Sequence, residues 1–216
     1  MTESLISTRF LFRFSVSCLY LKGLSATERE LGDEHRLPAL GELDGDRAIA
    51  DFRAAWSEAG LAFDVRVAGK RQPVWCREGK PEDSDGLQLW IDTRDARTIH
   101  RATRFCHRFV FLPAGGGRQF EQPVADQLLV DRARENANPV RPGQLQARSR
   151  ITPGGYTLWA FLPAAALTGF QPDDHPRIGF TYALFDRELG MQTFSVSGQL
   201  PFGSDPGLWG TLELVR

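Results

Sequence analysis

One short segment of the chain concentrates side chains that can bind anions or move protons. Asp92 and Arg94 are followed by His100, Arg104 and His107, with further arginines between them. Guanidinium and imidazole groups beside carboxylates bind phosphates, carboxylates or hydroxylated ligands through charge-assisted hydrogen bonds. We therefore predict that these five residues bind a ligand. The same pattern is also typical of a salt-bridged strand edge, which is the structural alternative.

Two tryptophans are candidates for an aromatic ligand contact. Trp75 lies in a loop rich in charge and proline, and Trp90 lies in the predicted strand 86–92. In that strand Trp90 points away from the aliphatic face, so it can lie on an open side of a sheet. The alternatives are a loop anchor for Trp75 and a covered, packed position for Trp90. The other three tryptophans (Trp56, Trp159 and Trp209) are predicted to be structural.

The sequence contains no recognisable catalytic motif. It has no Gly-x-Ser-x-Gly, no His-Glu-x-x-His and no nucleotide-binding glycine pattern. A zinc site can be drawn from Cys76, His100, Cys106 and His107, but no pair has the close spacing of a zinc motif. We predict no catalytic residue, no metal and no cofactor, and keep an undetected metal-dependent enzyme as an alternative hypothesis.

The elements that must position these residues are short strands. Apolar and polar residues alternate with period two in many short segments, which are separated by glycines and prolines. The predicted strands and hairpins cover residues 11–20, 61–68, 86–92, 104–112, 149–162, 178–185, 191–196 and 211–215. Residues 48–60 fit either an amphipathic helix or a strand, and we favour a strand whose hairpin turn, Ser57–Gly60, places Gly60 at positive φ.

This pattern predicts an all-β protein, an antiparallel, jelly-roll-like β-sandwich with one or two short helices. One helix is expected at residues 163–167, where a proline opens an alanine-rich turn. We predict a single domain over residues 1–216, because no repeat or break in composition divides the chain.

The charge of the chain is balanced overall and uneven locally. The net charge is −1, which gives no field directed at nucleic acid or at an acidic membrane. Residues 26–64 hold ten acids and four arginines (−6), whereas residues 94–150 hold eleven arginines and five acids (+6). Either two faces of one fold neutralise each other, or the arginines form a surface for anions or polyols.

The cysteines and the N-terminus indicate a cytoplasmic protein. Three cysteines form no disulfide framework, which favours a reducing compartment. Arg9 and Arg13 interrupt the apolar N-terminal stretch, so it does not fit a signal peptide. No run of eighteen apolar residues exists to cross a membrane.

Four motifs occur in an order that resembles the family 9 carbohydrate-binding modules and their DOMON-like relatives, over roughly residues 48–215. The motifs are an acidic turn before an Asp-ended strand (83–92), a Gly-Tyr strand running into Pro-Ala-Ala-Ala-Leu (155–167), Ile178-Gly179-Phe180 with Asp186 downstream, and an Asp-Pro-Gly turn before the last strand (205–214). The resemblance implies an antiparallel β-sandwich and a carbohydrate ligand.

One departure from the family concerns its sugar site. The sugar-binding members hold their ligand between two tryptophans, and the matching positions here are Glu82 and Val196. Neither side chain offers the flat apolar face that a sugar ring needs. The resemblance therefore extends to the fold and not to this clamp. Family members also bind calcium, but we map no calcium ligand onto this sequence.

We predict a non-catalytic binding module for a carbohydrate or another small polar or anionic ligand. The alternative is a structural or protein-interaction domain, which includes a homo-oligomer. The deciding observation is whether Trp75, Trp90 and His107 line one accessible concavity.

Overall fold

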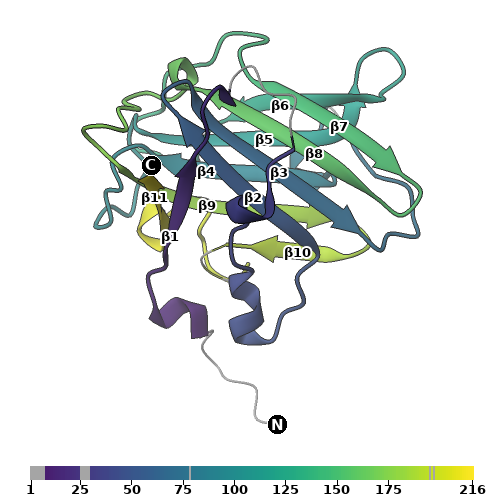
Figure 1. Cartoon of the computed structure of the whole chain (residues 1–216), viewed down its shortest axis with the longest axis horizontal. Coiled ribbons are helices and arrows are strands. Elements are labelled where there is room, and N and C mark those ends of the chain that lie inside the picture. The colour runs from purple at the N-terminus through teal and green to yellow at the C-terminus, as the bar shows by residue number, and fades with distance from the viewer. Residues whose placement is uncertain (1–7, 25–29, 78, 195, 197) are drawn as a thin grey trace.

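In the computed structural model, the described residues are 8–24, 30–77, 79–194, 196 and 198–216, and they form an all-β structure (Figure 1). Helical residues are confined to short 3-10 turns within this part of the chain. The elements are η1 (Thr8–Leu11), β1 (Ser15–Tyr20), η3 (Asp33–His35), η4 (Leu40–Asp44), β2 (Ala50–Ser57), β3 (Gly60–Ala68), η5 (Pro81–Asp83), β4 (Gly86–Asp92), β5 (Cys106–Gly116), β6 (Gln122–Leu128), β7 (Gln146–Thr152), β8 (Gly155–Pro163), η6 (Ala164–Ala166), β9 (Arg177–Asp186), β10 (Gly190–Thr193), η7 (Pro206–Leu208) and β11 (Gly210–Val215).

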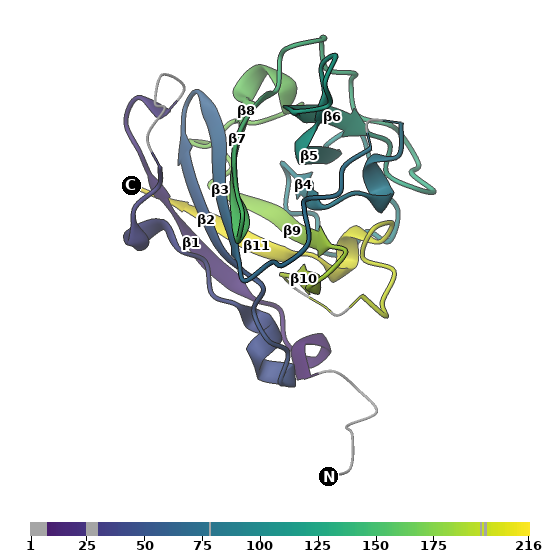
Figure 2. The same cartoon turned by 90° about the vertical axis from the view of Figure 1, so that its right-hand side faces the viewer.

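The strands form one continuous sheet that folds back on itself. The strand order is β6-β5-β4-β9-β11-β1-β2-β3-β8-β7, with β10 paired to β9. Figure 2 shows that β4, β5, β6 and β9 make one wall and that β2, β3, β7 and β8 make the other. This arrangement confirms the predicted β-sandwich. Within the described residues, no helix is long and apolar enough to cross a membrane.

The sheet differs from the prediction at β1 and β6. Strand β1 runs parallel to both of its neighbours, β11 and β2, so the sheet is mixed rather than purely antiparallel. The chain leaves β1 through a long connection before β2, as parallel neighbours require. Strand β6 was not predicted, because its residues are partly exposed at a sheet edge and show no clear apolar alternation.

The β2–β3 hairpin has the turn expected from the sequence. Ser57 pairs with Gly60, and Gly60 has φ 142°. A Cβ atom at this position would lie 2.0 Å from the Leu162 carbonyl oxygen on the neighbouring strand. Glycine is therefore required both by the backbone conformation and by the close approach of β8.

Aromatic rings join the two walls in the core. Phe52 of β2 stacks on Tyr182 of β9 with ring centroids 4.0 Å apart. Phe63 of β3 stacks on Phe180 of β9 at 5.7 Å. All four residues alternate with outward-facing neighbours, so period-two patterning places them in one apolar layer. This layer holds the two walls together. Because apolar side chains fill the space between the walls, we look for a ligand site in the loops at the ends of the sandwich.

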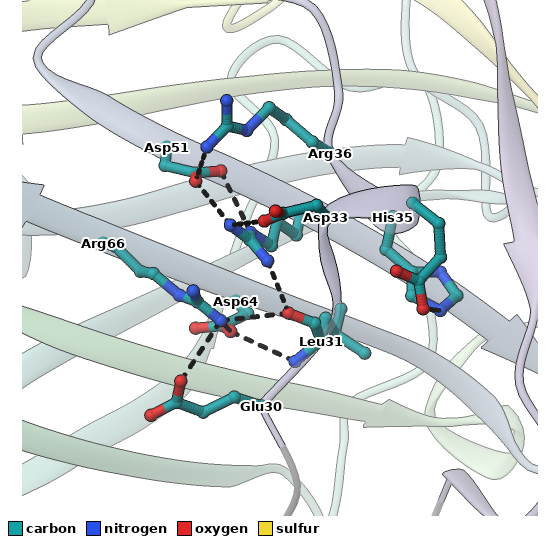
Figure 3. A network of polar contacts seen from close by, with 10 residues as sticks. Glu30, Leu31, Asp33, His35, Arg36, Asp51, Asp64 and Arg66 are labelled. Atoms are coloured by element: carbon teal, nitrogen blue, oxygen red, sulfur yellow. Dashed lines mark hydrogen bonds and ion pairs between the residues drawn. The ribbon is translucent and has the colours of Figure 1, made fainter.

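A loop crosses the outer surface of β2 and β3 and is held there by arginines (Figure 3). Arg53 and Arg66 both donate to the Leu31 carbonyl oxygen, at 2.7 and 3.0 Å. Arg53 also pairs with Asp33 (2.6 Å) and Asp51 (2.8 Å), and its side chain is 4% exposed. The acidic and basic residues of the N-terminal half thus neutralise one another across this face.

Candidate functional site

The structure does not bring Trp75, Trp90 and His107 into one concavity. Trp90 and His107 project from opposite faces of the β4–β5 wall, and both are buried. Trp75 is exposed in the loop that precedes β4. The seven residues predicted to bind a ligand therefore belong to separate environments.

Trp90 is covered by the segment between β10 and β11. Its indole Nε1 donates to the Gly203 carbonyl oxygen at 3.1 Å, and its ring meets the edge of Phe202 at 5.3 Å. The Arg108 guanidinium lies over the same ring at 5.3 Å. A polar partner for the indole N–H and packing around the ring are typical of a structural tryptophan.

His107 lies between the walls. Its side chain is fully buried and stacks on Phe109 with ring centroids 5.7 Å apart. Neither ring nitrogen makes a well-formed hydrogen bond, and the polar contact nearest to the ring is the backbone of Thr168. Burial lowers the pKa of His107 to about 4, so the imidazole is neutral in the folded protein. The sequence contained a signal for this placement, because His107 shares its odd-numbered face with Phe109 and Phe111.

Asp92 and Arg94 shape the turn after β4. The buried Asp92 carboxylate accepts the backbone N–H groups of Arg94 (3.0 Å) and Ala96 (2.7 Å). Burial raises the pKa of Asp92. The guanidinium groups of Arg94 and Arg104 lie over the Phe105 ring at 4.7 and 5.0 Å. These contacts fit the structural alternative of a cross-linked strand edge.

His100 lies on the surface, away from the buried residues of this segment. Its Nδ1 is 3.1 Å from a carboxylate oxygen of Asp205, and its side chain is 79% exposed. An exposed pair of this kind contributes little to stability.

The positions that match the family's sugar clamp have other roles here. Glu82 accepts a hydrogen bond from Arg108 at 2.6 Å, and Arg108 also donates to Gln88 at 2.8 Å. Val196 is buried in the cluster around Trp90. A sugar cannot be held between these two positions as it is between two aromatic rings.

The described residues contain no group of three or more His, Cys, Asp and Glu that could hold a metal ion. Burial raises the pKa of Cys76 and of Cys106 to about 12, so both thiols stay protonated.

A different set of residues meets at the end of the sandwich where β4 begins and β5 ends. The loops before β4, after β5 and after β9 lie together at this end (Figure 1). Trp75 belongs to the first of these loops and is 43% exposed. The contacts around Trp75 show how this exposed side chain is held.

Three buried charges anchor this end of the sandwich. The Lys70 ammonium lies 2.5 Å from Asp186 and 3.2 Å from Asp85, and all three side chains are at most 2% exposed. Asp186 also accepts the backbone N–H groups of Glu188 and Leu189, each at 2.9 Å. The ammonium and the N–H groups together compensate both buried carboxylates, as burial demands.

Asp85 connects these buried charges to the surface. One carboxylate oxygen accepts the backbone N–H of Trp75 at 3.0 Å, and the other accepts the N–H of Arg187 at 2.7 Å. The Arg187 guanidinium lies over the Trp75 ring at 4.6 Å. Trp75 and Arg187, which we term the loop-end platform, are thus fixed by one buried carboxylate.

A hollow of about 640 Å³ adjoins Trp75 along the chain and is lined by Cys76, Arg77, Gly79, Lys80 and Phe120. Phe120 is 63% exposed and has φ 57°, a conformation that a bulky residue seldom adopts. Two exposed aromatic residues, Trp75 and Phe120, lie in the loops that meet at this end of the sandwich, and they make it the candidate ligand site.

Sequence reasoning found Trp75 and missed its partners Asp85 and Arg187. It also missed the exposed Phe120, which lines the adjoining hollow. Asp85 stood out only as part of an acidic turn before a strand. Nothing in local spacing could show that Arg187, more than a hundred positions later, stacks on Trp75.

The fold is that of the family 9 carbohydrate-binding modules. No model of a protein family matches the chain, and no curated protein matches its sequence. Among solved structures, it is similar to such a module from Caldicellulosiruptor kristjanssonii in complex with cellotriose, with 13% identity, 94% of each chain covered and a TM-score of 0.61. A module from the same organism in complex with glucose has 14% identity, covers 94% of this chain and 95% of its own, and gives a TM-score of 0.57.

Proposed function

We propose that this protein is a non-catalytic carbohydrate-binding module whose ligand contacts the loop-end platform. The likeness in fold to modules that hold cellotriose and glucose supports this choice of ligand class. The absence of a recognisable catalytic motif in the sequence is consistent with binding alone. Fold likeness by itself does not assign a function, so the platform must carry the argument.

The observation that carries the proposal is the exposed indole of Trp75, held in place by Asp85 and stacked against Arg187. A flat indole face packs against the C–H groups of a sugar ring. The guanidinium offers several donors to hydroxyl groups in a fixed plane. Because the backbone of both residues is held by hydrogen bonds to Asp85, binding requires little ordering of the loop backbone.

Trp75 offers a sugar ring a single aromatic face, whereas the clamp of the family holds the ring between two tryptophans. We therefore expect weaker affinity for a single sugar unit than a two-sided clamp provides. A longer saccharide gains contacts by extending over the neighbouring hollow. Affinity should accordingly rise from glucose to cellotriose.

The test is titration with glucose and cellotriose, followed by NMR chemical shifts and calorimetry. The Trp75→Ala variant should lose binding and keep its fold, because the indole is 43% exposed and the hydrogen bonds to Asp85 come from the backbone of Trp75. Phe12→Ala is the matched control, since Phe12 is an exposed aromatic residue (60%) outside the platform and the hollow. Equal affinity of the Trp75→Ala variant and the parent protein would refute the proposal, as would failure to bind any saccharide in a broad panel.

A second candidate function is association with a protein or a second copy. Phe10, Leu11 and Phe12 are consecutive and 49%, 66% and 60% exposed. Adjacent exposed apolar side chains mark interaction surfaces. Light scattering of the parent protein and of a Phe10→Ser/Phe12→Ser variant tests this function, since a complex formed through this surface should dissociate in the variant.

We further propose a cytoplasmic location. Cys18, Cys76 and Cys106 are all free thiols, which a reducing compartment preserves. Alkylation of the protein in intact cells, followed by mass spectrometry, would show whether the thiols are reduced where the protein resides.

A further inference from the structure

We infer that Phe120 is a second stacking residue of the candidate ligand site, so that the site takes a saccharide chain rather than a single sugar unit. This inference rests on the proposed function and names the form of ligand that the same site holds. One unit of the chain would stack on the Trp75 indole, and a later unit would reach the Phe120 ring across the adjoining hollow.

A short series of contacts connects the loop of Trp75 with the turn of Phe120. The sulfur of Cys76, the residue after Trp75, lies within hydrogen-bonding reach of the Ala114 backbone. Gly115, the residue after Ala114, donates its N–H to the Phe120 carbonyl oxygen at 2.8 Å. Cys76 and Phe120 also line the same hollow of about 640 Å³. The two exposed aromatic residues therefore belong to loops that meet at this hollow.

The backbone of the turn holds the Phe120 ring in solvent. Two hydrogen bonds close the turn, from the Gly115 N–H to the Phe120 carbonyl oxygen at 2.8 Å and from the Phe120 N–H to the Gly117 carbonyl oxygen at 3.3 Å. Phe120 has φ 57° and is 63% exposed. This backbone conformation is unfavourable for a bulky residue, and strain of this kind is concentrated at ligand sites. Folding alone favours neither the exposed ring nor the positive φ, so we assign the ring to ligand contact.

The surroundings of the Phe120 ring suit a sugar. Residues 115–117 are glycines, which add no side chain to the turn. Arg77 and Lys80 are exposed at the same hollow and offer N–H donors. A sugar combines apolar C–H faces with hydroxyl groups, so an aromatic ring beside N–H donors is complementary to it. Because sugar hydroxyls are neutral, this match requires donors and no net positive charge.

The test is calorimetric titration of the intact chain with glucose and with cellotriose. The parent protein should bind cellotriose about tenfold more tightly than glucose, because a second unit gains one additional stacking contact. Phe120→Gly should lose this difference and keep the glucose affinity of the parent protein, since a single unit contacts only the loop-end platform. Glycine adopts positive φ readily, so this variant removes the ring without straining the turn.

Two further variants isolate the aromatic ring. Phe120→Tyr keeps a flat ring and should keep the preference for cellotriose. Leu129→Ala is the matched control, since Leu129 is an exposed apolar residue (66%) that follows the far end of β6 and lies outside the hollow. This control should bind both saccharides as the parent protein does.

The outcomes separate this inference from the proposed function. A preference for cellotriose that survives in Phe120→Gly, or that the parent protein lacks, overturns the inference while Trp75-dependent binding still upholds the module. Failure of both saccharides to bind refutes the proposed function and the inference together. If the parent protein self-associates in light scattering and Phe120→Gly does not, a second copy covers the ring, and the inference is likewise overturned.

Discussion

Trp75 and Asp85 are joined by two hydrogen bonds that make a short ladder ahead of β4. The Trp75 N–H donates to the Asp85 carboxylate at 3.0 Å, and the Asp85 N–H donates to the Trp75 carbonyl oxygen at 2.7 Å. An exposed aromatic residue is thereby tied to a fully buried charge. The backbone of the exposed Trp75 is therefore held in place by the buried Asp85 carboxylate.

The Asp85→Asn variant should loosen Trp75. The carboxylate accepts from Trp75 and Lys70 on one oxygen and from Arg187 on the other. An amide has only one acceptor oxygen, so its NH₂ group would face a donor and leave that donor unpaired. We expect stability to fall by about 1–3 kcal/mol. Acrylamide should also quench tryptophan fluorescence more strongly.

The control for this experiment is Asp83→Asn, an exposed carboxylate two positions away. Its stability and quenching should match those of the parent protein. Unchanged quenching in Asp85→Asn would show that Trp75 is held by other contacts.

Removal of the Lys70 charge should destabilise the fold strongly. In Lys70→Met, Asp85 and Asp186 would face each other in the interior with no cation between them. Breaking a buried pair in this way costs about 3–5 kcal/mol of unfolding free energy. Urea denaturation measures the loss, and Lys22→Met, an exposed lysine, should change stability by less than about 0.5 kcal/mol. If Lys70→Met also lost less than about 0.5 kcal/mol of unfolding free energy, the role assigned to the Lys70 ammonium would be contradicted.

Period-two alternation predicted most strands and their inward faces, as in β3, where Phe63 and Val65 are both fully buried. The same alternation places His107 on the inward face of its strand, together with Phe109 and Phe111. The alternation could not show what covers the outer face of a wall. Trp90 points outward as expected, but a segment more than a hundred residues later, at Phe202 and Gly203, lies over it.

Topology and the candidate site were harder to predict for the same physical reason. The parallel pairing of β1 with β2 and β11 depends on contacts between distant segments. The platform depends on Arg187 reaching Trp75, and no local pattern records that contact. Local periodicity specifies faces of strands, whereas sites arise where loops of different strands meet.

His107 should make the protein less stable as the pH falls. The pKa of its imidazole is about 4 in the folded state and about 6.5 when unfolded, so between these values only the unfolded chain takes up the proton. The stability is therefore fully present above the unfolded pKa and is lost as the pH falls toward 4. We expect a loss of about 2 kcal/mol between pH 7 and pH 5 from this group.

Urea denaturation of His107→Leu at both pH values isolates this effect. Leucine fills a similar volume and cannot titrate, so the loss on acidification should shrink by that amount. Identical pH profiles for His107→Leu and the parent would contradict a neutral buried imidazole.

Arg53 should be required to hold the loop that contains Leu31 and Asp33 against β2 and β3. Its guanidinium is 4% exposed and binds Asp51, Asp33 and the Leu31 carbonyl oxygen. Arg53→Met should lower stability by about 1–3 kcal/mol, because the partly buried Asp51 and the carbonyl oxygen of the buried Leu31 each lose a donor. Limited proteolysis should then cleave this loop faster.

Arg36 provides the comparison, since it contacts the same Asp51 from a 57% exposed position. Arg36→Gln should cost less than about 1 kcal/mol and leave proteolysis unchanged, because solvent screens an exposed pair. If the two variants behaved alike, burial would not be what gives Arg53 its role.

Gly60→Ala should test how closely β8 approaches the β2–β3 turn. The substitution adds a Cβ atom 2.0 Å from the Leu162 carbonyl oxygen and imposes φ 142° on an alanine. We expect a loss of about 2–4 kcal/mol. Gly190→Ala separates the two causes, because Gly190 also has positive φ (101°) but an added Cβ would meet no atom within 4 Å. That variant should lose only about 1 kcal/mol, and equal losses at the two positions in thermal or urea denaturation would show that backbone strain, not contact with β8, requires glycine at position 60.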